Sequence, residues 1–223
     1  MGRRALPRID PGLDLTGWLI AEESLPTPVS GQVLFGRSAP LQIEVGSGKG
    51  LFLTRATAAT PAHDFLGIEI AAKYARFAAA RLARRRGTNG KVIHGDGVRI
   101  FHDRLADNSL EAVHVYFPDP WWKRRHRKRR VMQAAFLQDV QRTLRVGGQL
   151  HFWTDVAEYY ETTLALIRQT TQLAGPIVPD ERPSDHDLDY QTHFERRMRL
   201  DDLPVYRSVF CKEAAGVQPR AQA

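Results

Sequence analysis

Short apolar runs alternate along the chain with longer segments whose apolar positions recur at helical spacing. The runs predict strands at 41–45, 65–70, 92–94, 112–117, 149–153 and 205–211. The segments between them predict helices at about 50–59, 71–86, 130–145 and 156–171. Strands separated by helices of this length need crossover connections, which place them parallel in one sheet. The pattern therefore predicts an α/β fold with a mostly parallel central sheet and helices on both faces.

Prolines and glycines mark the limits of this pattern. Five prolines among the first 40 residues predict an irregular N-terminal arm at 1–35, followed by one domain at 36–213 and a C-terminal tail at 214–223. Gly147 and Gly148 are expected to end the helix at 130–145. The segment 175–190, rich in Pro and Asp, is expected to be a loop.

Composition narrows the class of protein. With 223 residues, 43% of them hydrophobic, the chain can bury one full core. Cys211 is the single cysteine, which excludes an intramolecular disulfide and favours a cytoplasmic location. No apolar run is long enough to span a bilayer, and the histidines lack ligand spacing, so neither a membrane partner nor a metal site is expected. A monomer and a homodimer are both compatible with the sequence.

A glycine-rich loop follows the predicted strand at 41–45. Gly46, Gly48 and Gly50 have the spacing G-x-G-x-G, which differs from the dinucleotide-binding fingerprint and from a P-loop. Glu44, on the strand itself, would repel an anionic ligand and attract a cationic one. A sulfonium and an ammonium group fit that environment, so the loop predicts S-adenosyl-L-methionine as the cofactor.

Two further acids follow the next predicted strands. Glu69 lies about twenty residues after the loop, where a carboxylate can accept hydrogen bonds from ribose hydroxyls. Asp96 follows the third strand, where an adenine edge would be read. With Glu44, Gly46 and Gly48 they are candidate cofactor-binding residues. The alternative is that these acids only cap helices.

The segment after the strand at 112–117 is the most distinctive one. It reads F-P-D-P-W-W at 117–122 and K-R-R-H-R-K-R-R at 123–130, so seven Lys and Arg residues occur there without an acid. The chain has 32 Lys and Arg against 25 Asp and Glu, and outside this segment the charges balance. Such a concentrated excess predicts a polyanionic partner such as a nucleic-acid backbone. A bare basic run is equally typical of an import signal or a solvated helix face.

The residues just before the basic run favour a binding site. Asp119 lies between Pro118 and Pro120, which restrict the backbone on both sides and make the turn stiff. Trp121 and Trp122 provide aromatic surfaces on which a base can stack, although one of them could pack between the turn and the sheet.

Taken together, these motifs resemble the tRNA (guanine-N7-)-methyltransferase family of class I, Rossmann-like S-adenosylmethionine enzymes. The resemblance extends over about residues 35–211. Its motifs are E-V-G-S-G-K-G at 44–50, G-I-E at 67–69, the block at 117–130, F-W-T-D at 152–155, T-H-F-E at 192–195 and P-V-Y-R at 204–207. Trp122 replaces a residue that is often proline in the family, and His193-Phe194 occupies a variable stretch.

The resemblance implies a Rossmann-like class I methyltransferase fold and specific residue roles. Asp119 is implied to be the catalytic carboxylate and, with Glu44, Glu69 and Asp96, to contact S-adenosyl-L-methionine. The implied substrate-binding residues are Lys123, Asp155, Thr192, His193, Phe194 and Glu195. The implied RNA-binding residues are Arg125, His126, Arg127, Lys128, Arg129 and Arg130. The implied reaction methylates N7 of a guanine in tRNA, at position 46 in the variable loop.

Two other functions are left open. Asp119-Pro120-Trp121 partly matches the D-P-P-[YFW] turn that amino-methyltransferases acting on adenine N6 or guanine N2 carry at the same strand end, but the second proline is missing. A Rossmann-like core that binds RNA without catalysis is the alternative from another class. An NAD-linked oxidoreductase is disfavoured by the glycine spacing.

Overall fold

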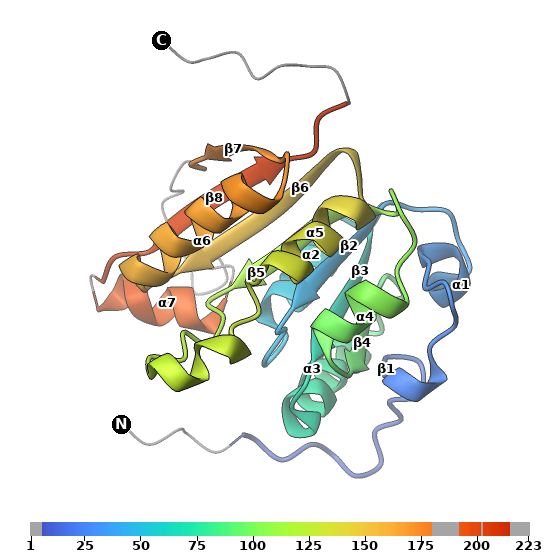
Figure 1. Cartoon of the computed structure of the whole chain (residues 1–223). Helices are drawn as coiled ribbons and strands as arrows, with labels where there is room; N and C mark the ends of the chain where they lie inside the picture. The colour runs from blue at the N-terminus through green and yellow to red at the C-terminus, as the bar shows by residue number, and fades with distance from the viewer. Residues whose placement is uncertain (1–5, 180–191, 202, 215–223) are drawn as a thin grey trace.

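The structure is a computed structural model of the chain, which describes residues 6–179, 192–201 and 203–214 (Figure 1). The described residues form one eight-stranded sheet with the strand order β1-β4-β3-β2-β5-β6-β8-β7. Its strands are β1 (Leu19–Ala21), β2 (Leu41–Val45), β3 (Asp64–Glu69), β4 (Gly90–His94), β5 (Leu110–Tyr116), β6 (Leu144–Thr154), β7 (Ala174–Ile177) and β8 (Tyr206–Cys211). Among the described strands, β8 alone runs antiparallel to the others, so the predicted mostly parallel sheet is confirmed.

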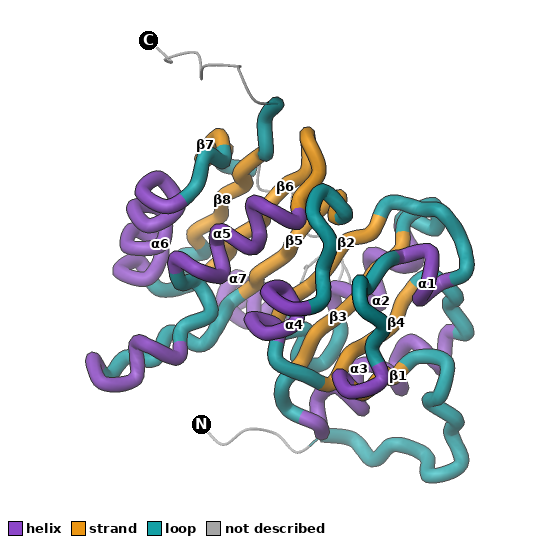
Figure 2. Tube along the Cα trace, turned by 45° about the vertical axis from the view of Figure 1, so that its right-hand side comes forward, coloured by secondary structure: helices purple, strands orange, loops and turns teal. Residues whose placement is uncertain are grey.

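Helices cover both faces of the sheet (Figures 1 and 2). They are α1 (Gly31–Phe35), α2 (Leu51–Ala59), α3 (Ala72–Arg85), α4 (Gly97–Asp103), α5 (Ala134–Thr143), α6 (Ala157–Thr170) and α7 (His193–Leu200), with the short 3₁₀ helices η1 (Glu22–Ser24) and η2 (Arg124–Arg129). In Figure 1, α4, α5 and α6 lie in front of the sheet, and α2 and α3 lie behind it. The central strand β3 is buried along its whole length, as a strand covered on both faces must be.

Strand order places the carboxyl ends of four strands at one edge. The chain runs from β2 outward through β3 to β4, and then returns to the other side of β2 as β5. In such sheets ligands bind at the edge where the strand order reverses, here between β2 and β5. The loops that follow β2, β3, β4 and β5 all start at this edge, so the motifs found in the sequence meet there.

The N-terminal segment expected to be irregular contributes to the sheet. Leu19–Ala21 pairs with β4 in parallel, and the Trp18 carbonyl accepts a hydrogen bond from Val92 N at 2.8 Å. Leu15 is buried against Ala80 and Ala83 of α3. The prolines lie between short ordered pieces, and burial of scattered apolar side chains holds those pieces on the domain. The expectation of an irregular arm over all of 1–35 was therefore wrong for its described part.

Two local expectations were also wrong. Helix α5 ends at Thr143 and β6 begins at the next residue, so Gly147 and Gly148 lie inside the strand. A Cβ on Gly148 would lie 2.8 Å from the Arg145 carbonyl oxygen, which explains why a glycine occupies this irregular stretch of β6. The expected loop at 175–190 overlaps β7, and its residues from 180 onward lie outside the described part of the chain.

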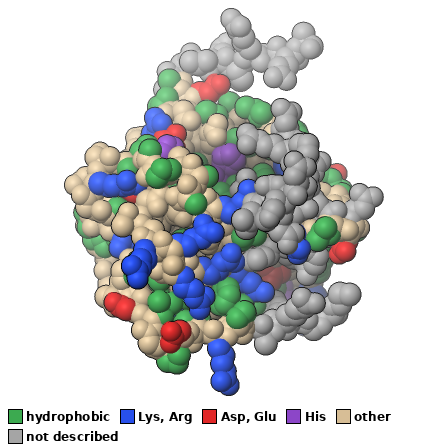
Figure 3. Space-filling view, turned by 180° about the vertical axis from the view of Figure 1, so that it is seen from behind, with side chains coloured by type: hydrophobic (Ala, Val, Ile, Leu, Met, Phe, Trp, Pro, Cys, Tyr) green, Lys and Arg blue, Asp and Glu red, His purple; other side chains and the backbone are tan. Residues whose placement is uncertain are grey.

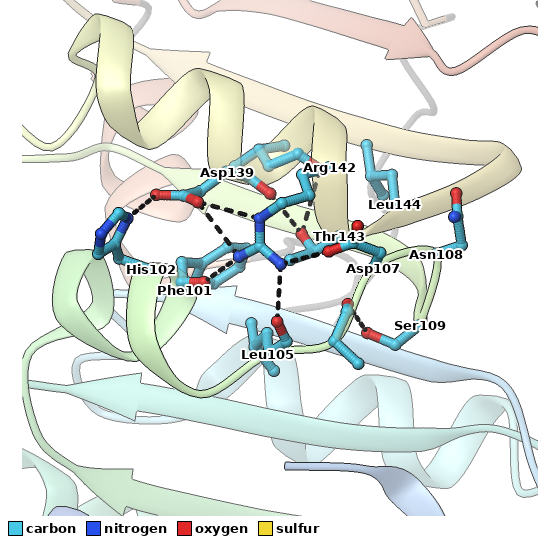
Figure 4. Close-up of polar contacts among 12 residues, drawn as sticks. Phe101, His102, Leu105, Asp107, Asn108, Ser109, Asp139, Arg142, Thr143 and Leu144 are labelled. Carbon is cyan, nitrogen blue, oxygen red and sulfur yellow. Dashed lines mark hydrogen bonds and ion pairs between the residues drawn. The ribbon is translucent and has the colours of Figure 1, made fainter. Parts of the chain in front are cut away.

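Arg142 on α5 anchors the segment that leads into β5 (Figure 4). Its guanidinium donates to the carbonyl oxygens of Phe101 at 2.7 Å and Leu105 at 2.8 Å, which lie at the end of α4 and just beyond it. It also pairs with Asp107 at 2.7 Å and Asp139 at 3.1 Å. These contacts lie before β5 begins, far from the edge where its carboxyl end lies, so we regard this network as structural.

No described helix combines the length and the apolar character that crossing a bilayer would require.

Candidate active site

The glycine loop after β2 is held tightly between β3 and α3. Gly46 N donates to the Ile68 carbonyl at 2.8 Å, and Gly48 N donates to Glu69 Oε2 at 2.8 Å. Gly50 has φ +68°, and a Cβ there would lie 2.7 Å from Ala78 Cβ. Glycine at this position lets α2 begin directly against α3. The loop is therefore tied to β3 by hydrogen bonds and packed against α3 at the end of β2.

Glu69 and Asp96 both bind backbone N–H groups at this edge. Glu69 Oε1 accepts from Ala71 N at 2.8 Å while its Oε2 accepts from Gly48 N. Asp96 caps α4 and accepts from Val98 N at 2.9 Å. Helix capping, the alternative considered from the sequence, is thus part of what these acids do. Each carboxylate oxygen has a second lone pair, so capping does not prevent either acid from binding a ligand.

Glu22 is a site residue that sequence reasoning missed. It is buried in η1, its Oε2 accepts from Asp96 N at 2.9 Å, and its Oε1 accepts from Arg99 Nε at 2.5 Å. The hydrogen bond from Arg99 lowers the pKa of Glu22, so the carboxylate is held in its charged form. The proline-rich sequence around Glu22 gave no signal of this role, because only the pairing of β1 with β4 brings it to Asp96.

Glu44 is a buried acid whose hydrogen bonding is incomplete. It is only 3% exposed, and its Oε2 has no hydrogen-bond partner in the described part of the chain. Burial, and then the nearby charge of Glu69, raises the pKa of Glu44 well above its ordinary value. The buried Ser47 Oγ likewise lacks a partner among the described residues. A cationic ligand with hydrogen-bonding groups would satisfy both atoms.

A chain of buried polar side chains runs beside Glu44 on the same sheet face. His114 Nε2 lies 2.8 Å from Gln42 Oε1, and His114 Nδ1 lies 2.9 Å from the Tyr116 hydroxyl. The His114 ring stacks on His151 at 4.6 Å, and burial lowers the pKa of His151 to about 4. Burial also lowers the pKa of His114 well below its ordinary value, so neither ring supplies positive charge at neutral pH.

Helix α7 brings the T-H-F-E motif to this face. Thr192 Oγ1 accepts from Glu195 N at 3.0 Å, and the buried Glu195 pairs with Arg207 of β8 at 3.3 Å. Burial raises the pKa of Tyr116 well above its ordinary value, and the charges of Glu44 and Glu195 add to that shift. His193 and Phe194 belong to α7, but their side chains lie outside the described part.

The turn after β5 has the opposite character, because it is open. Phe117 and Trp121 have φ values of +49° and +44°, which are rare for residues other than glycine and bracket Asp119. Asp119 is exposed, and its Oδ1 accepts from Trp121 N at 3.3 Å. Trp122 is 66% exposed. Strained backbone thus presents a carboxylate and an indole to solvent.

The basic run separates into exposed and buried side chains. Lys123, Arg125, Arg127, Lys128 and Arg129 are exposed in and around η2, and His126 is half-buried against the Trp121 ring. Arg130 is buried instead. It pairs with Glu158 at 2.9 Å, donates to the Pro120 carbonyl at 2.8 Å and lies over the Tyr159 ring. Arg130 therefore anchors the turn to α6, unlike the exposed cations of the run.

Asp155 directly follows β6, the strand next to β5, and is half-buried. The carboxyl ends of these strands thus collect Glu44, Gly46, Gly48, Glu69, Asp96, Asp119 and Asp155, and Glu195 of α7 pairs with Arg207 of the neighbouring β8. Lys123 directly precedes η2 and is exposed. Within the described ranges, no three His, Cys, Asp or Glu side chains are grouped closely enough to hold a metal ion.

Comparison with known proteins places this arrangement in a family. A family model described as a putative methyltransferase matches residues 38–208. The tRNA (guanine-N(7)-)-methyltransferase of Rhodopirellula baltica is 50% identical over 220 residues, which cover 96% of this chain and 81% of that protein. The chain belongs to the tRNA (guanine-N(7)-)-methyltransferase family. The enzyme of the same name from Xanthomonas campestris pv. campestris strain 8004 is 39% identical over 189 residues, 83% of this chain and 68% of that protein.

A solved structure shows the same fold. Phosphoethanolamine N-methyltransferase 2 of Haemonchus contortus superposes with a TM-score of 0.53 at 12% identity, covering 81% of this chain and 51% of that one. As a member of the tRNA (guanine-N(7)-)-methyltransferase family, the chain is a class I methyltransferase that uses S-adenosyl-L-methionine. The residues fit this cofactor, because the unpaired Glu44 oxygen and Ser47 hydroxyl lie buried at a glycine loop with further acids on the two next strands.

Proposed function

We propose that this enzyme methylates N7 of a guanine in tRNA, at position 46 in the variable loop, and works in the cytoplasm. One observation carries the proposal: a buried, uncompensated acid at the end of β2 and an exposed acid, indole and basic run at the end of β5 lie on adjacent strands. The first suits a small cation, and the second suits a base within a large polyanion. The tRNA and the N7 atom are named by the relatives, and the position follows from the family resemblance.

The cofactor half of the site is built to hold a small cation. S-adenosyl-L-methionine, when bound, supplies a methyl group on a positively charged sulfur. Glu44 provides the opposite charge in a buried environment, where an ionic interaction is only weakly screened. Glu69 fixes the loop through Gly48 and keeps lone pairs for ribose hydroxyls. Asp96, held by Glu22, completes the edge on the side of β4.

Asp119 stabilises the charge that develops on the base. Guanine N7 has an in-plane lone pair and loses no proton when it is methylated, so a general base is not required. Positive charge grows on the purine instead. A carboxylate placed to accept from N1–H and N2–H₂ orients the base and stabilises that cation. Asp155 or Glu195 supplies a second acceptor from the neighbouring strand or from α7.

The exposed part of the turn recognises RNA. Trp122 provides a stacking surface for the target base, whereas Trp121 packs under Arg129 and His126. Lys123 lies beside them to contact the target nucleotide. Arg125, Arg127, Lys128 and Arg129 grip phosphates, and His126 shapes the turn. We assign Arg130 to anchoring this turn through Glu158, in place of RNA contact.

The test is incubation of the purified protein with radiolabelled S-adenosyl-L-methionine and unmodified tRNA transcripts, followed by borohydride and aniline treatment. N7-methylguanosine is cleaved under these conditions, so one cut in the variable loop is expected. Incorporated label without any cut would indicate methylation of an exocyclic amine, at adenine N6 or guanine N2. Absence of label on every tRNA, with tRNA still bound, would support the non-catalytic RNA-binding alternative.

A further inference from the structure

A second concentration of positive charge lies on α3. Between Glu69 and Asp96 the sequence contains no acid, but it contains seven Lys and Arg residues. Five of them, which we call the α3 cationic surface, are exposed on α3 or directly after it: Lys73, Arg76, Arg84, Arg85 and Arg86. Figure 3 views the face on which α2 and α3 lie, and Lys and Arg side chains gather near the middle of its described part.

The described residues offer these cations little neutralisation. Within the described ranges, Lys73, Arg76, Arg84 and Arg86 form no ion pair with a carboxylate. Two acids of the N-terminal segment accept hydrogen bonds from their own segment instead, Asp10 from Gly12 N and Asp14 from Thr16 N.

Like charges crowd one another around Arg81, one turn before Arg84 and Arg85 on α3. Burial, and then the charges of Arg85 and Arg84, lowers the pKa of Arg81. The Arg81 and Arg85 guanidinium groups donate to the carbonyl oxygens of Lys49 and Thr54, so both lie against α2 and the glycine loop. A solvated helix face usually mixes opposite charges at i,i+4 spacing, and like charges at that spacing are destabilising. Repulsion among these cations would be relieved by an anionic partner.

Strand order places this surface opposite the basic run of η2. Helix α3 follows β3, and η2 follows β5, and the two strands lie on either side of β2 with its glycine loop. Neighbouring strands are about 4.8 Å apart, so the two strand ends are separated by roughly 10 Å. From Lys73, near this edge, to Arg84 the surface extends about 16 Å along α3, which leads back to the start of β4. A long polyanion lying across the site edge would contact both basic elements.

We propose that the α3 cationic surface is a second phosphate-binding surface, which grips the tRNA backbone on the side of the cofactor loop opposite to η2. The proposal rests on the proposed function, since it takes tRNA as the polyanion. It adds a surface for binding tRNA, whereas the residues proposed for methyl transfer lie at the ends of β2 and β5. The surface contacts phosphates without reading bases, so it contributes affinity and salt dependence and leaves the methyl-transfer step unchanged.

The test compares three variants. The first, Lys73→Gln, Arg76→Gln and Arg84→Gln together, removes three charges and keeps helix propensity. The second, Lys73→Arg, Arg76→Lys and Arg84→Lys, preserves them. The third, Arg168→Gln, removes one exposed arginine from α6 on the other face. KM for full-length tRNA, kcat, cofactor affinity and the salt dependence of tRNA binding are measured for each.

The neutral triple variant is expected to lower the slope of log affinity against log salt by about 2. It should raise the KM for tRNA roughly tenfold, with kcat and cofactor affinity unchanged. The charge-preserving variant and Arg168→Gln should behave like the wild type. A wild-type slope in the neutral variant would overturn the proposal, as would an equal loss in the charge-preserving variant. Failure of the proposed function is distinguishable, because the wild-type protein itself would then leave tRNA unmethylated in the same assay.

Discussion

The loop after β2 and the turn after β5 lie on adjacent strands, yet they are built in opposite ways. In the first, backbone N–H groups of Gly46 and Gly48 are hydrogen-bonded to β3, and a Cβ would not fit at Gly50. In the second, Asp119 is exposed, and its hydrogen bond is to Trp121 N of the same turn.

The difference fits the size of the ligand that we propose for each segment. A small cofactor has to be enclosed, so its loop is rigid and its charged partner, Glu44, remains buried at a cost in stability. A tRNA brings its own surface and excludes water when it binds, so the turn after β5 can stay open before binding. Stiffness there comes from Pro118, Pro120 and the Arg130 anchor rather than from burial.

The largest effect is expected at the open turn. Asp119→Asn keeps the oxygen that accepts from Trp121 N but removes the negative charge. Turnover at saturating tRNA and cofactor should fall roughly 10²–10³-fold, the usual cost of removing one group that stabilises developing charge. Single-turnover methylation of tRNA measures it. Asp103→Asn, an exposed aspartate on α4, is the control, and near-full turnover in Asp119→Asn would refute the assigned role.

The rigidity of the cofactor loop can be tested with a pair of glycines. Gly50 and Gly36 have φ values of +68° and +70°, but only at Gly50 would a Cβ meet another atom closely. Gly36→Ala should cost about 1–2 kcal/mol of unfolding free energy for its left-handed backbone. Gly50→Ala should cost roughly 1–3 kcal/mol more through overpacking against Ala78. Urea denaturation measures both, and equal costs would mean that the loop is not tightly packed.

Trp122 should matter for tRNA more than for folding. Trp122→Ala is expected to raise the KM for tRNA by a factor of roughly 5 to 150, the equivalent of about 1–3 kcal/mol of base stacking. Trp122→Phe should restore most of the loss, because it keeps an aromatic face. Steady-state kinetics measures the KM for tRNA, and thermal melting measures the stability of the fold. A loss of melting temperature without a change in KM would instead make this indole a packing residue.

Glu44→Gln should have opposite effects on stability and on cofactor binding. The pKa of Glu44 is raised in the folded state. Its contribution to stability is therefore complete at pH values below the pKa of an ordinary glutamate, and it is lost as the pH rises through the pKa of the folded state. Without ligand, the variant should therefore melt higher than the wild type at pH 8 but not near pH 4. Its affinity for S-adenosyl-L-methionine should fall about tenfold. Melting curves and calorimetric titration test both, and an unchanged affinity would contradict the role of Glu44.

Elements with a strong local signal were predictable from the sequence. The apolar run at 41–45 is β2 residue for residue, and the helices at 50–59, 71–86 and 156–171 differ from α2, α3 and α6 by one residue at the ends. Their apolar spacing repeats over many residues, so it is visible without tertiary contacts. Short elements were missed, among them β1, α4 and α7, because three to eight residues carry too little periodicity to be recognised.

The sequence by itself determined the chemistry available at the site: an acid before a glycine loop, acids after the next two strands, and an acid, two indoles and a basic run after another. Only the tertiary structure decided which of these groups are charged, buried or exposed. Arg129 and Arg130 are neighbours in the chain, yet one is exposed and the other is held by Glu158, 28 residues further on. Glu22 likewise reaches Asp96 across 74 residues. Local spacing fixes which residues follow a strand, whereas burial and pairing depend on how distant elements pack, and no local pattern records that.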